Sequence, residues 1–584
     1  MARVKLAKNA GFCMGVRRAM DMVLEAVMKQ NGFIYTYGPL IHNPQVLDIL
    51  EGKGVKALAE EDAEKLLSCP PEKSSVTVII RAHGVSPEES QKIKDMGVKI
   101  LNATCPHVGK VQGIIKRYAL KGYSIIIVGD KDHAEVIGLL GYAQGKGYVV
   151  QSPKELESIP PLDKVCLVAQ TTQDTNRFQA LAAAVRNKFP GAEVFNTICA
   201  STERRQAEVL TLAQKVEAMV VVGGSGSGNT RRLVKISEDA GVPTFHVETE
   251  EDLDLKTLSR YSIIGVTAGA STPNWLILKV VEHLKALGTP RGVAHYLEKI
   301  GRLAAISYIL LAVGAGCLTY ASVLLQGLDP KLSCPLVAAL YVFSMHVLNR
   351  LVDKPSERFN QPGRTDFYDR HGNLMMASGI SSAIIALTLT WFQGMLPFML
   401  LLAISGLGMI YNIRLFPGQP GKLSRYRKLK DIPGSKTIFV ALAWGMVTSL
   451  LPPLAQKGQL STGTLVAFLF SSILVFVRST LYDFKDIQGD LMVGKETIPI
   501  VLGKRKTEIL TVSLLCLLGG LLIIAAPLKW ATTVTYFLLF SFGYIVAYYF
   551  LYQKKILGRG FSFEGVVDGS FIFAGMLAFL WSIL

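Results

Sequence analysis

Three cysteines in the first half of the chain stand in similar sequence contexts. Each follows a short strand-like run and precedes a helix-length segment: Asn9-Ala-Gly-Phe-Cys13, Asn102-Ala-Thr-Cys105 and Asn196-Thr-Ile-Cys199. They lie 92 and 94 residues apart, which predicts three comparable modules that each give one thiol to a shared centre. Three thiolates at helix starts suit Zn²⁺ or an iron–sulfur cluster with one open iron site, and spacing does not choose between these metals. Isolated cysteines are more often buried small apolar residues, which is our interpretation of Cys69 and Cys166.

Polar side chains occupy the turns after other predicted strands of this half. Because such turns converge at the carboxyl ends of parallel strands, where helix N-termini attract phosphate, we expect them to form one site. A lone histidine would be weak evidence, and the glycine-rich loop 224–228 lacks the Gly-Lys-Ser/Thr ending of a P-loop. The three histidines His42, His83 and His133, together with Ser227, Asn229 and Ser271, predict a diphosphate site. Glu135 and Thr171 lie in the same set of turns.

The elements that must position these residues alternate between short β-branched runs and helix-length segments. The runs 76–81, 124–128 and 219–222 are examples. This alternation predicts α/β layers with parallel sheets. The N-terminus has no apolar core of signal-peptide length, and the eight cysteines show no disulfide framework, so we expect this half in the cytoplasm.

From Leu303 onward, apolar segments long enough to cross a bilayer recur. We count nine, near residues 304–326, 332–351, 374–392, 394–413, 436–455, 462–481, 508–526, 532–551 and 564–584. The loops after the second, fourth, sixth and eighth segments carry most of the Lys and Arg, which marks them as cytoplasmic and accounts for the net charge of +17 without nucleic acid. The sequence predicts a multi-pass protein in the lipid bilayer of the cell inner membrane, with its C-terminus opposite the cytoplasmic first half.

Two of these cytoplasmic loops hold acidic residues where a helix leaves the membrane. One carries Asn349, Asp353 and Glu357, and the other carries Asp486 and Asp490. Carboxylates four residues apart share a helical face, and two such faces suit Mg²⁺ ions that neutralise a diphosphate. One acidic run alone would be a solvated loop, whereas two at membrane depth favour a function. In the basic loop 414–436, Lys422 and Lys430 are candidates for binding diphosphate or anionic headgroups, although topology alone explains that loop.

The cysteine and turn motifs together resemble the LytB/IspH family of hydroxymethylbutenyl diphosphate reductases over residues 3–285, since six motifs occur in the family's order. The resemblance implies a [4Fe–4S] cluster on Cys13, Cys105 and Cys199, with the fourth iron free for the substrate hydroxyl. It implies that Glu135, with His133 and Thr171, delivers the proton that lets the hydroxyl leave as water. It also implies a diphosphate held by His42, His83, Ser227, Asn229 and Ser271. Where some members have a second Ser, this chain has Gly228, so one phosphate contact is expected from a backbone N–H.

The apolar segments and their acidic motifs resemble the UbiA superfamily of intramembrane prenyltransferases over nearly all of residues 302–584. The family patterns N-x-x-x-D-x-x-x-D and D-x-x-x-D fall on Asn349, Asp353 and Glu357, and on Asp486 and Asp490. The resemblance implies Mg²⁺-assisted loss of diphosphate and capture of the allylic cation by an electron-rich acceptor. Glu357 departs from the usual Asp but keeps a carboxylate. Arg350, where many members carry another Asp, is a candidate phosphate contact.

We therefore expect a reductase-like domain at 1–288, with modules near 1–98, 99–195 and 196–288, a linker at 289–301 and a membrane domain at 302–584. The expected fold class is an α/β three-module domain around a central cluster, followed by an all-α nine-helix transmembrane domain. The expected function is a bifunctional isoprenoid enzyme that takes electrons from reduced ferredoxin or flavodoxin and acts on isoprenoid diphosphates. Two alternatives are a membrane-tethered iron–sulfur sensor that regulates the transferase, which Glu135 disfavours, and a reductase with a mere membrane anchor, which the acidic motifs disfavour.

Overall fold

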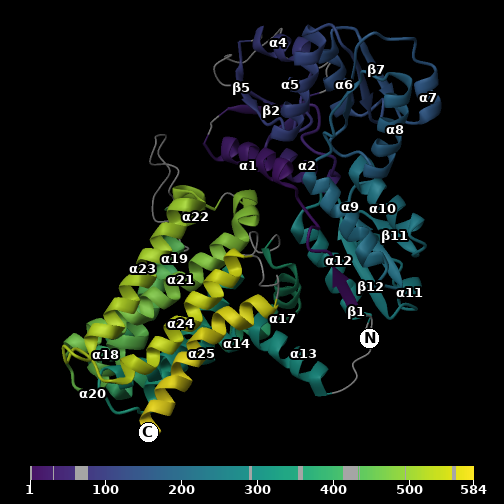
Figure 1. Ribbon diagram of the computed structural model, residues 1–584. Helices are drawn as coiled ribbons and strands as arrows, with labels where there is room; N and C mark the ends of the chain where they lie inside the picture. Colours follow the sequence, from purple (N-terminus) through teal and green to yellow (C-terminus); the bar gives the residue numbers. More distant parts are fainter. Residues whose placement is uncertain are drawn as a thin grey trace. The chain divides into compact units, whose positions relative to one another are not determined.

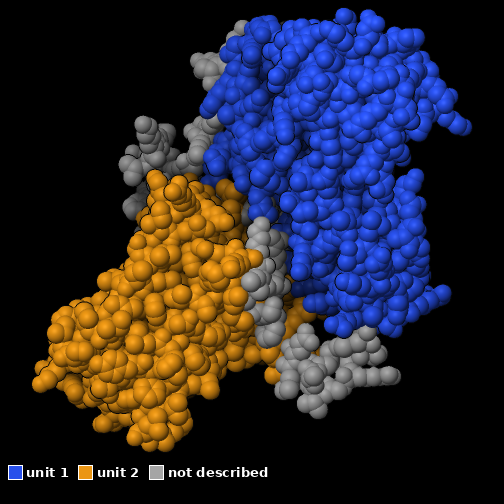
Figure 2. All heavy atoms as spheres, in the orientation of Figure 1, with its two compact units in different colours: residues 1–290 blue, residues 291–584 orange. Residues whose placement is uncertain are grey.

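The structure is a computed structural model of the chain and describes residues 3–29, 32–58, 76–95, 97–287, 293–352, 360–411, 432, 434–493, 495–554 and 561–584. It divides into two compact units, Met1–Pro290 and Arg291–Leu584, which Figure 2 colours blue and orange. The first unit is α/β and the described part of the second is all-α, as predicted.

Three four-stranded sheets form the first unit (Figure 1), and every strand pair within them is parallel. The first sheet, in spatial order, is β3 (Val55–Leu58), β2 (Phe33–Tyr37), β4 (Val76–Ile80) and β5 (Lys99–Asn102). The second is β7 (Gly147–Val150), β6 (Ser124–Val128), β8 (Val165–Ala169) and β9 (Glu193–Val194). The third is β1 (Arg3–Leu6), β12 (Ile263–Ala268), β10 (Ala218–Val222) and β11 (Thr244–Val247).

The three sheets repeat one plan. In each sheet, two central strands lie between an outer strand and a second edge strand that leads to a cysteine. The central pairs are β2 and β4, β6 and β8, and β10 and β12. These cysteine strands are β5, β9 and β1, so the first and second sheets end with their own cysteine strands, whereas the third is completed from the N-terminus. The module limits near 98 and 195 stay predictions. The first falls just before β5, which belongs to the first sheet, and the second falls just after β9.

Helices follow the strands of the first unit and cover the sheets. They are α1 (Met14–Lys29), α2 (Pro44–Glu51), α4 (Pro87–Asp95), α5 (Pro106–Leu120), α6 (Ala134–Leu140), α7 (Pro153–Glu157), α8 (Thr175–Lys188), α9 (Ala200–Ala213), α10 (Gly228–Asp239), α11 (Leu255–Leu258) and α12 (Asn274–Ala286), with short 3₁₀ turns at Gly141–Ala143 and Glu250–Asp252.

The central strands are buried on both faces, which explains their continuous apolar sequences. In β6, Ile125, Ile126, Ile127 and Val128 are all 0% exposed. Cys166 in β8 is also fully buried, as predicted, while Cys69 lies outside the described residues. Burying one such aliphatic side chain contributes about 1.5–3 kcal/mol to the free energy of folding. The strands therefore hold in place the loops that leave their carboxyl ends.

The second unit is a bundle of helices, most of them long and apolar. They are α13 (Val293–Ile306), α14 (Ile309–Leu325), α15 (Ser333–Val352), α17 (Pro362–Gln393), α18 (Met395–Ile410), α19 (Ser435–Gly445), α20 (Leu451–Gln456), α21 (Thr462–Val493), α22 (Ile498–Leu502), α23 (Lys504–Ala525), α24 (Val534–Gln553) and α25 (Phe561–Ile583). A π-helical turn, Met446–Leu450, joins α19 to α20 into one span, Ser435–Gln456.

Each of the nine predicted apolar segments corresponds to a helix, but the number of full spans differs. Within the described ranges, seven helices are long and apolar enough to cross a membrane, and a bent pair of α13 and α14 gives up to eight. The segment predicted at 394–413 is the shorter helix α18, Met395–Ile410. The prediction of nine spans is therefore approximate, because apolar length in sequence does not exclude a short or broken helix.

The bent pair turns by 76° at Ser307 and Tyr308. Tyr308 adopts a left-handed backbone conformation with φ of 66°. The Arg364 guanidinium lies 4.6 Å from the Tyr308 ring centroid and donates to the Ala305 carbonyl at 3.0 Å. The Ala305 carbonyl also accepts from the Tyr308 N–H at 3.3 Å, so Arg364 adds a second donor to a carbonyl at the end of α13.

Candidate functional site

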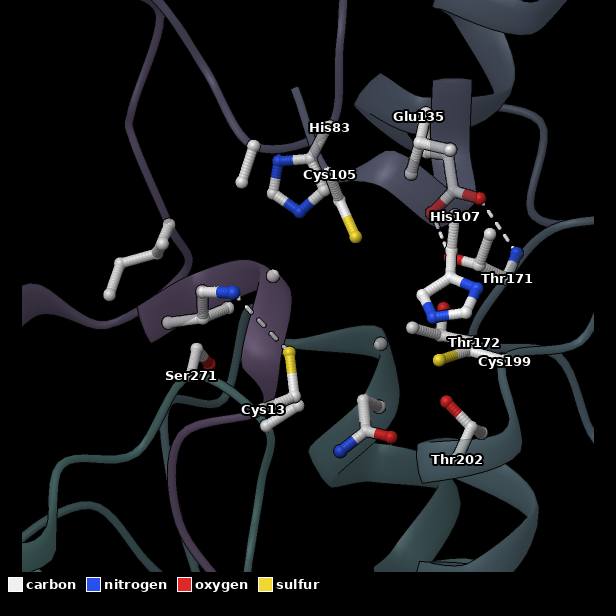
Figure 3. A pocket seen from close by; sticks show the side chains of 18 of the residues that line it. Cys13, His83, Cys105, His107, Glu135, Thr171, Thr172, Cys199, Thr202 and Ser271 are labelled. Carbon is white, nitrogen blue, oxygen red and sulfur yellow. Dashed lines mark hydrogen bonds between the residues drawn. The ribbon is translucent and has the colours of Figure 1, made fainter. Parts of the chain in front are cut away.

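The three predicted cysteines lie at the starts of three helices and line one pocket (Figure 3). Cys105 and Cys199 occupy the cap positions of α5 and α9, and Cys13 precedes α1. The helices approach one another closely here, since a Cβ added to Gly15 would collide with the sulfur of Cys105. The three thiols therefore line the same pocket, and their role as ligands of a shared centre stays a prediction.

The chemistry of this donor set fits a metal group. Burial is the main cause that raises the pKa of the Cys105 thiol, and the nearby Cys13 and Cys199 raise it further. Three thiolates together thus need a compensating positive charge. Soft thiolate ligands select iron–sulfur clusters or zinc, and the geometry of the thiols alone does not decide between them.

Three histidines from two sheets face each other in the same pocket. The ring centroids of His42 and His83 are 4.7 Å apart, and those of His42 and His133 are 5.5 Å apart. Burial is the main cause that lowers the pKa of all three, to about 4 for His133, so the rings are neutral at pH 7. Their ring nitrogens lie within 4.8 Å of one another, which would also suit a metal ion.

The tautomer of His133 follows from its position at the cap of α6. Its Nδ1 accepts a hydrogen bond from the backbone N–H of Glu135 at 3.1 Å, so the neutral ring carries its proton on Nε2. His42 Nε2, His83 Nδ1 and Asn229 Nδ2 are buried and have no hydrogen-bond partner in the described part of the chain. Buried polar atoms without partners mark a site built for a polar ligand.

Glu135 is 1% exposed, and both oxygens of its carboxyl group contact Thr171 (Figure 3). The Thr171 backbone N–H donates to Oε1 at 2.6 Å, and the Thr171 hydroxyl donates to Oε2 at 2.9 Å. Burial raises the pKa of Glu135, while these two hydrogen bonds lower it. A buried carboxyl group with a raised pKa can store a proton and release it to a ligand in the pocket.

The remaining predicted residues of the first unit lie on the third sheet's loops and line the same pocket. Ser227 caps α10, where its hydroxyl accepts from the Thr230 N–H at 3.3 Å. The Ser271 hydroxyl donates to the His42 carbonyl at 3.0 Å, which ties two modules together. A Cβ at Gly228 would lie 3.5 Å from Asp130, an ordinary contact, so glycine is not required there by space.

In the second unit, the second acidic motif lies on α21. Asp483, Asp486 and Asp490 are spaced three and four residues apart and so share a helical face. Asp490 accepts from Asn360 Nδ2 at 3.0 Å, and Asp483 accepts from the Thr437 hydroxyl at 2.6 Å. Asp483 is an addition to the predicted set. The oxygen-only donors of this face fit Mg²⁺.

The first acidic motif is described only at Asn349, on α15. Asp353 and Glu357, and the basic residues Lys422 and Lys430, lie outside the described residues. Arg350 donates to the Thr365 hydroxyl at 2.9 Å and stacks on Tyr368. These contacts do not test whether Arg350 binds a phosphate, which stays a prediction.

Sequence reasoning missed several buried charges. Arg205 on α9 is 4% exposed and donates to the Gly11 and Ala268 carbonyls, and its charge lies near Cys13 and Cys199. In the second unit, Arg364 pairs with Glu564 at 2.9 Å and Arg478 pairs with Asp568 at 2.7 Å. Charged residues within membrane helices are a signal of paired or functional groups that can be found in a sequence. Arg478, Glu564 and Asp568 carry this signal, because they lie inside or beside apolar segments.

The Arg478–Asp568 pair allows a stability prediction. Arg478→Gln leaves the Asp568 carboxylate buried with the Tyr482 hydroxyl at 3.3 Å, which we expect to destabilise the second unit by roughly 3–5 kcal/mol. The double variant Arg478→Met, Asp568→Leu removes both charges and should lose less. Thermal unfolding of the full chain in detergent measures both. A double variant that is less stable than the single one would contradict the prediction.

Comparisons with known proteins agree with this division. A family model described as LytB protein matches residues 4–285, and one described as UbiA prenyltransferase family matches residues 309–563. Two relatives carry the name 4-hydroxy-3-methylbut-2-enyl diphosphate reductase. The protein of Caldanaerobacter subterraneus subsp. tengcongensis is 42% identical over 285 residues, which are 49% of this chain and 97% of the relative. That of Geobacter sulfurreducens is 43% identical over 282 residues, which are 48% of this chain and 96% of the relative.

Two solved structures each match about half of this chain. A reductase from Plasmodium falciparum has a TM-score of 0.45 and 30% identity, and the match covers 48% of this chain and 87% of that one. A UbiA homologue from Aeropyrum pernix K1 has a TM-score of 0.38 and 14% identity, and the match covers 47% of this chain and 98% of that one.

Proposed function

Because the chain belongs to the LytB protein family through residues 4–285 and carries a UbiA prenyltransferase region at 309–563, it is an enzyme of two parts, and we propose a specific reaction for each. The first part removes the hydroxyl group of 4-hydroxy-3-methylbut-2-enyl diphosphate reductively. The observation that carries this proposal is the convergence of three thiols, three neutral histidines and Glu135 in one pocket.

The reaction breaks the allylic C–O bond, consumes two electrons and two protons, and releases water with isopentenyl or dimethylallyl diphosphate. Cys13, Cys105 and Cys199 would hold a [4Fe–4S] cluster, which would pass on the two electrons of the reduced donor one at a time and would offer, at its iron without a cysteine, a Lewis acid for the hydroxyl oxygen. His42, His83, Ser227, Asn229 and Ser271 bind the diphosphate through N–H and O–H donors. Glu135 donates the proton that the departing hydroxyl needs, and Thr171 holds its carboxyl group in place.

The second, membrane-embedded part transfers a prenyl group from its diphosphate to an aromatic or lipid acceptor. Asp486 and Asp490, with Asn349, Asp353 and Glu357, would hold Mg²⁺, and Lys422 and Lys430 would bind the diphosphate. The ions neutralise the leaving diphosphate, and the bundle keeps water from the allylic cation. We place the first part on the cytoplasmic side of the inner membrane, where reduced ferredoxin or flavodoxin can reach it.

An anaerobic assay of the purified full chain tests the proposal directly. With 4-hydroxy-3-methylbut-2-enyl diphosphate and reduced methyl viologen, both five-carbon diphosphates should form. With Mg²⁺, a panel of allylic diphosphates and a set of acceptors, prenylated product should form. Diphosphate binding without reduction would favour a sensor, and reduction without any prenyl transfer would favour an anchor.

The neutral histidines give a pH prediction. A bound diphosphate favours a protonated ring and raises the pKa of His133 from about 4, so binding takes up protons and the affinity increases as the pH falls from 7 toward 5. In His133→Asn the new amide still caps α6, but the protein should take up fewer protons, by up to about one. Calorimetric titration with inorganic pyrophosphate in two buffers of different ionisation enthalpy measures the uptake. Equal uptake by both proteins would show that the diphosphate does not lie close to His133.

A further inference from the structure

Arg232 is a largely buried cation on the helix that begins at the proposed diphosphate site. It lies on α10, one turn after Ser227 and Asn229, and its side chain is 12% exposed, whereas the adjacent Arg231 is exposed. All three of its guanidinium nitrogens donate hydrogen bonds, and every acceptor belongs to the second module. Nη2 bonds to Asp130 Oδ2 at 2.8 Å, Nη1 to the Thr172 carbonyl at 2.8 Å and Nε to Gln173 Oε1 at 3.1 Å.

These acceptors lie in the two loops that form the Glu135 site. Asp130 is in the loop after β6 that leads to His133 and Glu135, and Thr172 directly follows Thr171 in the loop after β8. Figure 3 shows Thr171 below Glu135, and Thr172 next to it and lower in the view.

The fully buried Gln170 joins the two loops. Its Oε1 accepts from the Asp130 N–H at 3.0 Å, and its Nε2 donates to the Thr172 hydroxyl at 3.1 Å. Thr171, which contacts both oxygens of Glu135, is thereby fixed on its two sides. A planar guanidinium that donates to three acceptors at once positions a loop better than a single point charge can.

We propose that Arg232 is a positioning residue that couples the two ends of the substrate: it holds the Thr171 loop, and with it Glu135, at a fixed place relative to the helix whose N-terminus binds the diphosphate. The proposal rests on the proposed reduction. A proton donor must lie within hydrogen-bond distance of its target, and a displacement of about 1 Å can lower the rate about 10²-fold. The positive charge of Arg232 also lies near Glu135 and lowers its pKa, against the effect of burial.

The test compares Arg232→Gln and Arg232→Lys with the wild-type full chain, assayed with 4-hydroxy-3-methylbut-2-enyl diphosphate and reduced methyl viologen. Arg232→Gln should lower kcat about 10–100-fold while KM and the affinity for inorganic pyrophosphate change less than about threefold. Because Glu135 must be protonated to act, and loss of the cation raises its pKa, the decline of kcat at alkaline pH should move to higher pH. Arg232→Lys keeps the charge, so its pH profile should return toward the wild type, with kcat restored only in part.

Lys235→Gln is the matched control, because Lys235 is an exposed cation on the same helix. It should leave every value unchanged. Unchanged kcat and pH profile in Arg232→Gln would overturn the proposal. So would a loss confined to KM and pyrophosphate affinity, which would make Arg232 a diphosphate ligand. If the Arg232→Gln protein loses its iron, its kcat no longer tests the proposal, and the Arg232→Lys protein is used instead. A wild-type kcat in Arg232→Lys would then overturn the positioning role. An inactive wild-type chain would refute the proposed reduction itself, and the positioning role with it.

Discussion

A Glu135→Gln variant is expected to keep its cluster and its fold while reductive turnover falls by a factor of about 10²–10⁴, the usual contribution of a general acid. The amide is nearly isosteric with the carboxyl group. Its oxygen can accept from the Thr171 N–H, and its NH₂ group can donate to the Thr171 hydroxyl, so both contacts at Thr171 persist. What the variant lacks is a proton that can leave at neutral pH.

The measurement is kcat with reduced methyl viologen, together with the iron and sulfide content of the same sample. Asp132→Asn is the matched control, because Asp132 is an exposed carboxylate three residues before Glu135, in the loop that leads into α6. It should keep wild-type turnover. Near-normal turnover of Glu135→Gln with an intact cluster would remove Glu135 from the mechanism and leave the proton donor unassigned.

An Asp486→Asn variant should lose Mg²⁺-dependent prenyl transfer by about 10²-fold or more, which corresponds to about 3 kcal/mol of transition-state stabilisation. Asp486 lies between Asp483 and Asp490 on α21, and Asp490 is close enough to interact with its charge. An amide keeps the size of the side chain but removes one of the negative charges that hold a divalent cation. Reductive turnover should be unchanged, because the proposed reductase site lies wholly within the first unit.

Prenyl transfer is measured as labelled product in detergent or vesicles over a range of Mg²⁺ concentrations. Asp366→Asn, at an exposed carboxylate on α17, is the matched control and should behave as wild type. Wild-type transfer by Asp486→Asn at low Mg²⁺ would show that the acidic face of α21 does not hold the ion, and the anchor interpretation would then gain support.

The convergence of the first unit's site could be predicted because it depends on a general rule. Loops at the carboxyl ends of parallel strands meet, so a histidine or serine just after a β-branched run can be assigned to the site without knowing the sheet order. His42, His83, Ser227 and Ser271 all illustrate this, since each follows one of the central strands β2, β4, β10 and β12.

The buried arginines could not be predicted in the same way. Arg204 and Arg205 are adjacent, as are Arg231 and Arg232, yet in each pair the first is exposed and the second is largely buried. Which member faces inward depends on the rotation of α9 and α10 against neighbouring modules, and two identical residues carry no periodicity to indicate it. The sequence did not indicate the sheet partner of β1 either, because four residues with a mixed burial pattern do not specify the strand with which they pair.

That N-terminal strand has a consequence for biosynthesis. Arg3 to Leu6 pair with Ile263 to Val266, so the third sheet closes a contact across almost the whole first unit. Contacts of such long sequence separation form late, because the chain entropy of the loop must be lost first. During translation, the N-terminal strand stays unpaired until β12 has left the ribosome. The first long apolar helix, α14, begins at Ile309, soon after β12 in the sequence. The thiol pocket is therefore completed at about the same stage of translation as membrane insertion begins. If β1 pairs late, the edge of the third sheet stays unpaired and exposed while the apolar helices are being inserted.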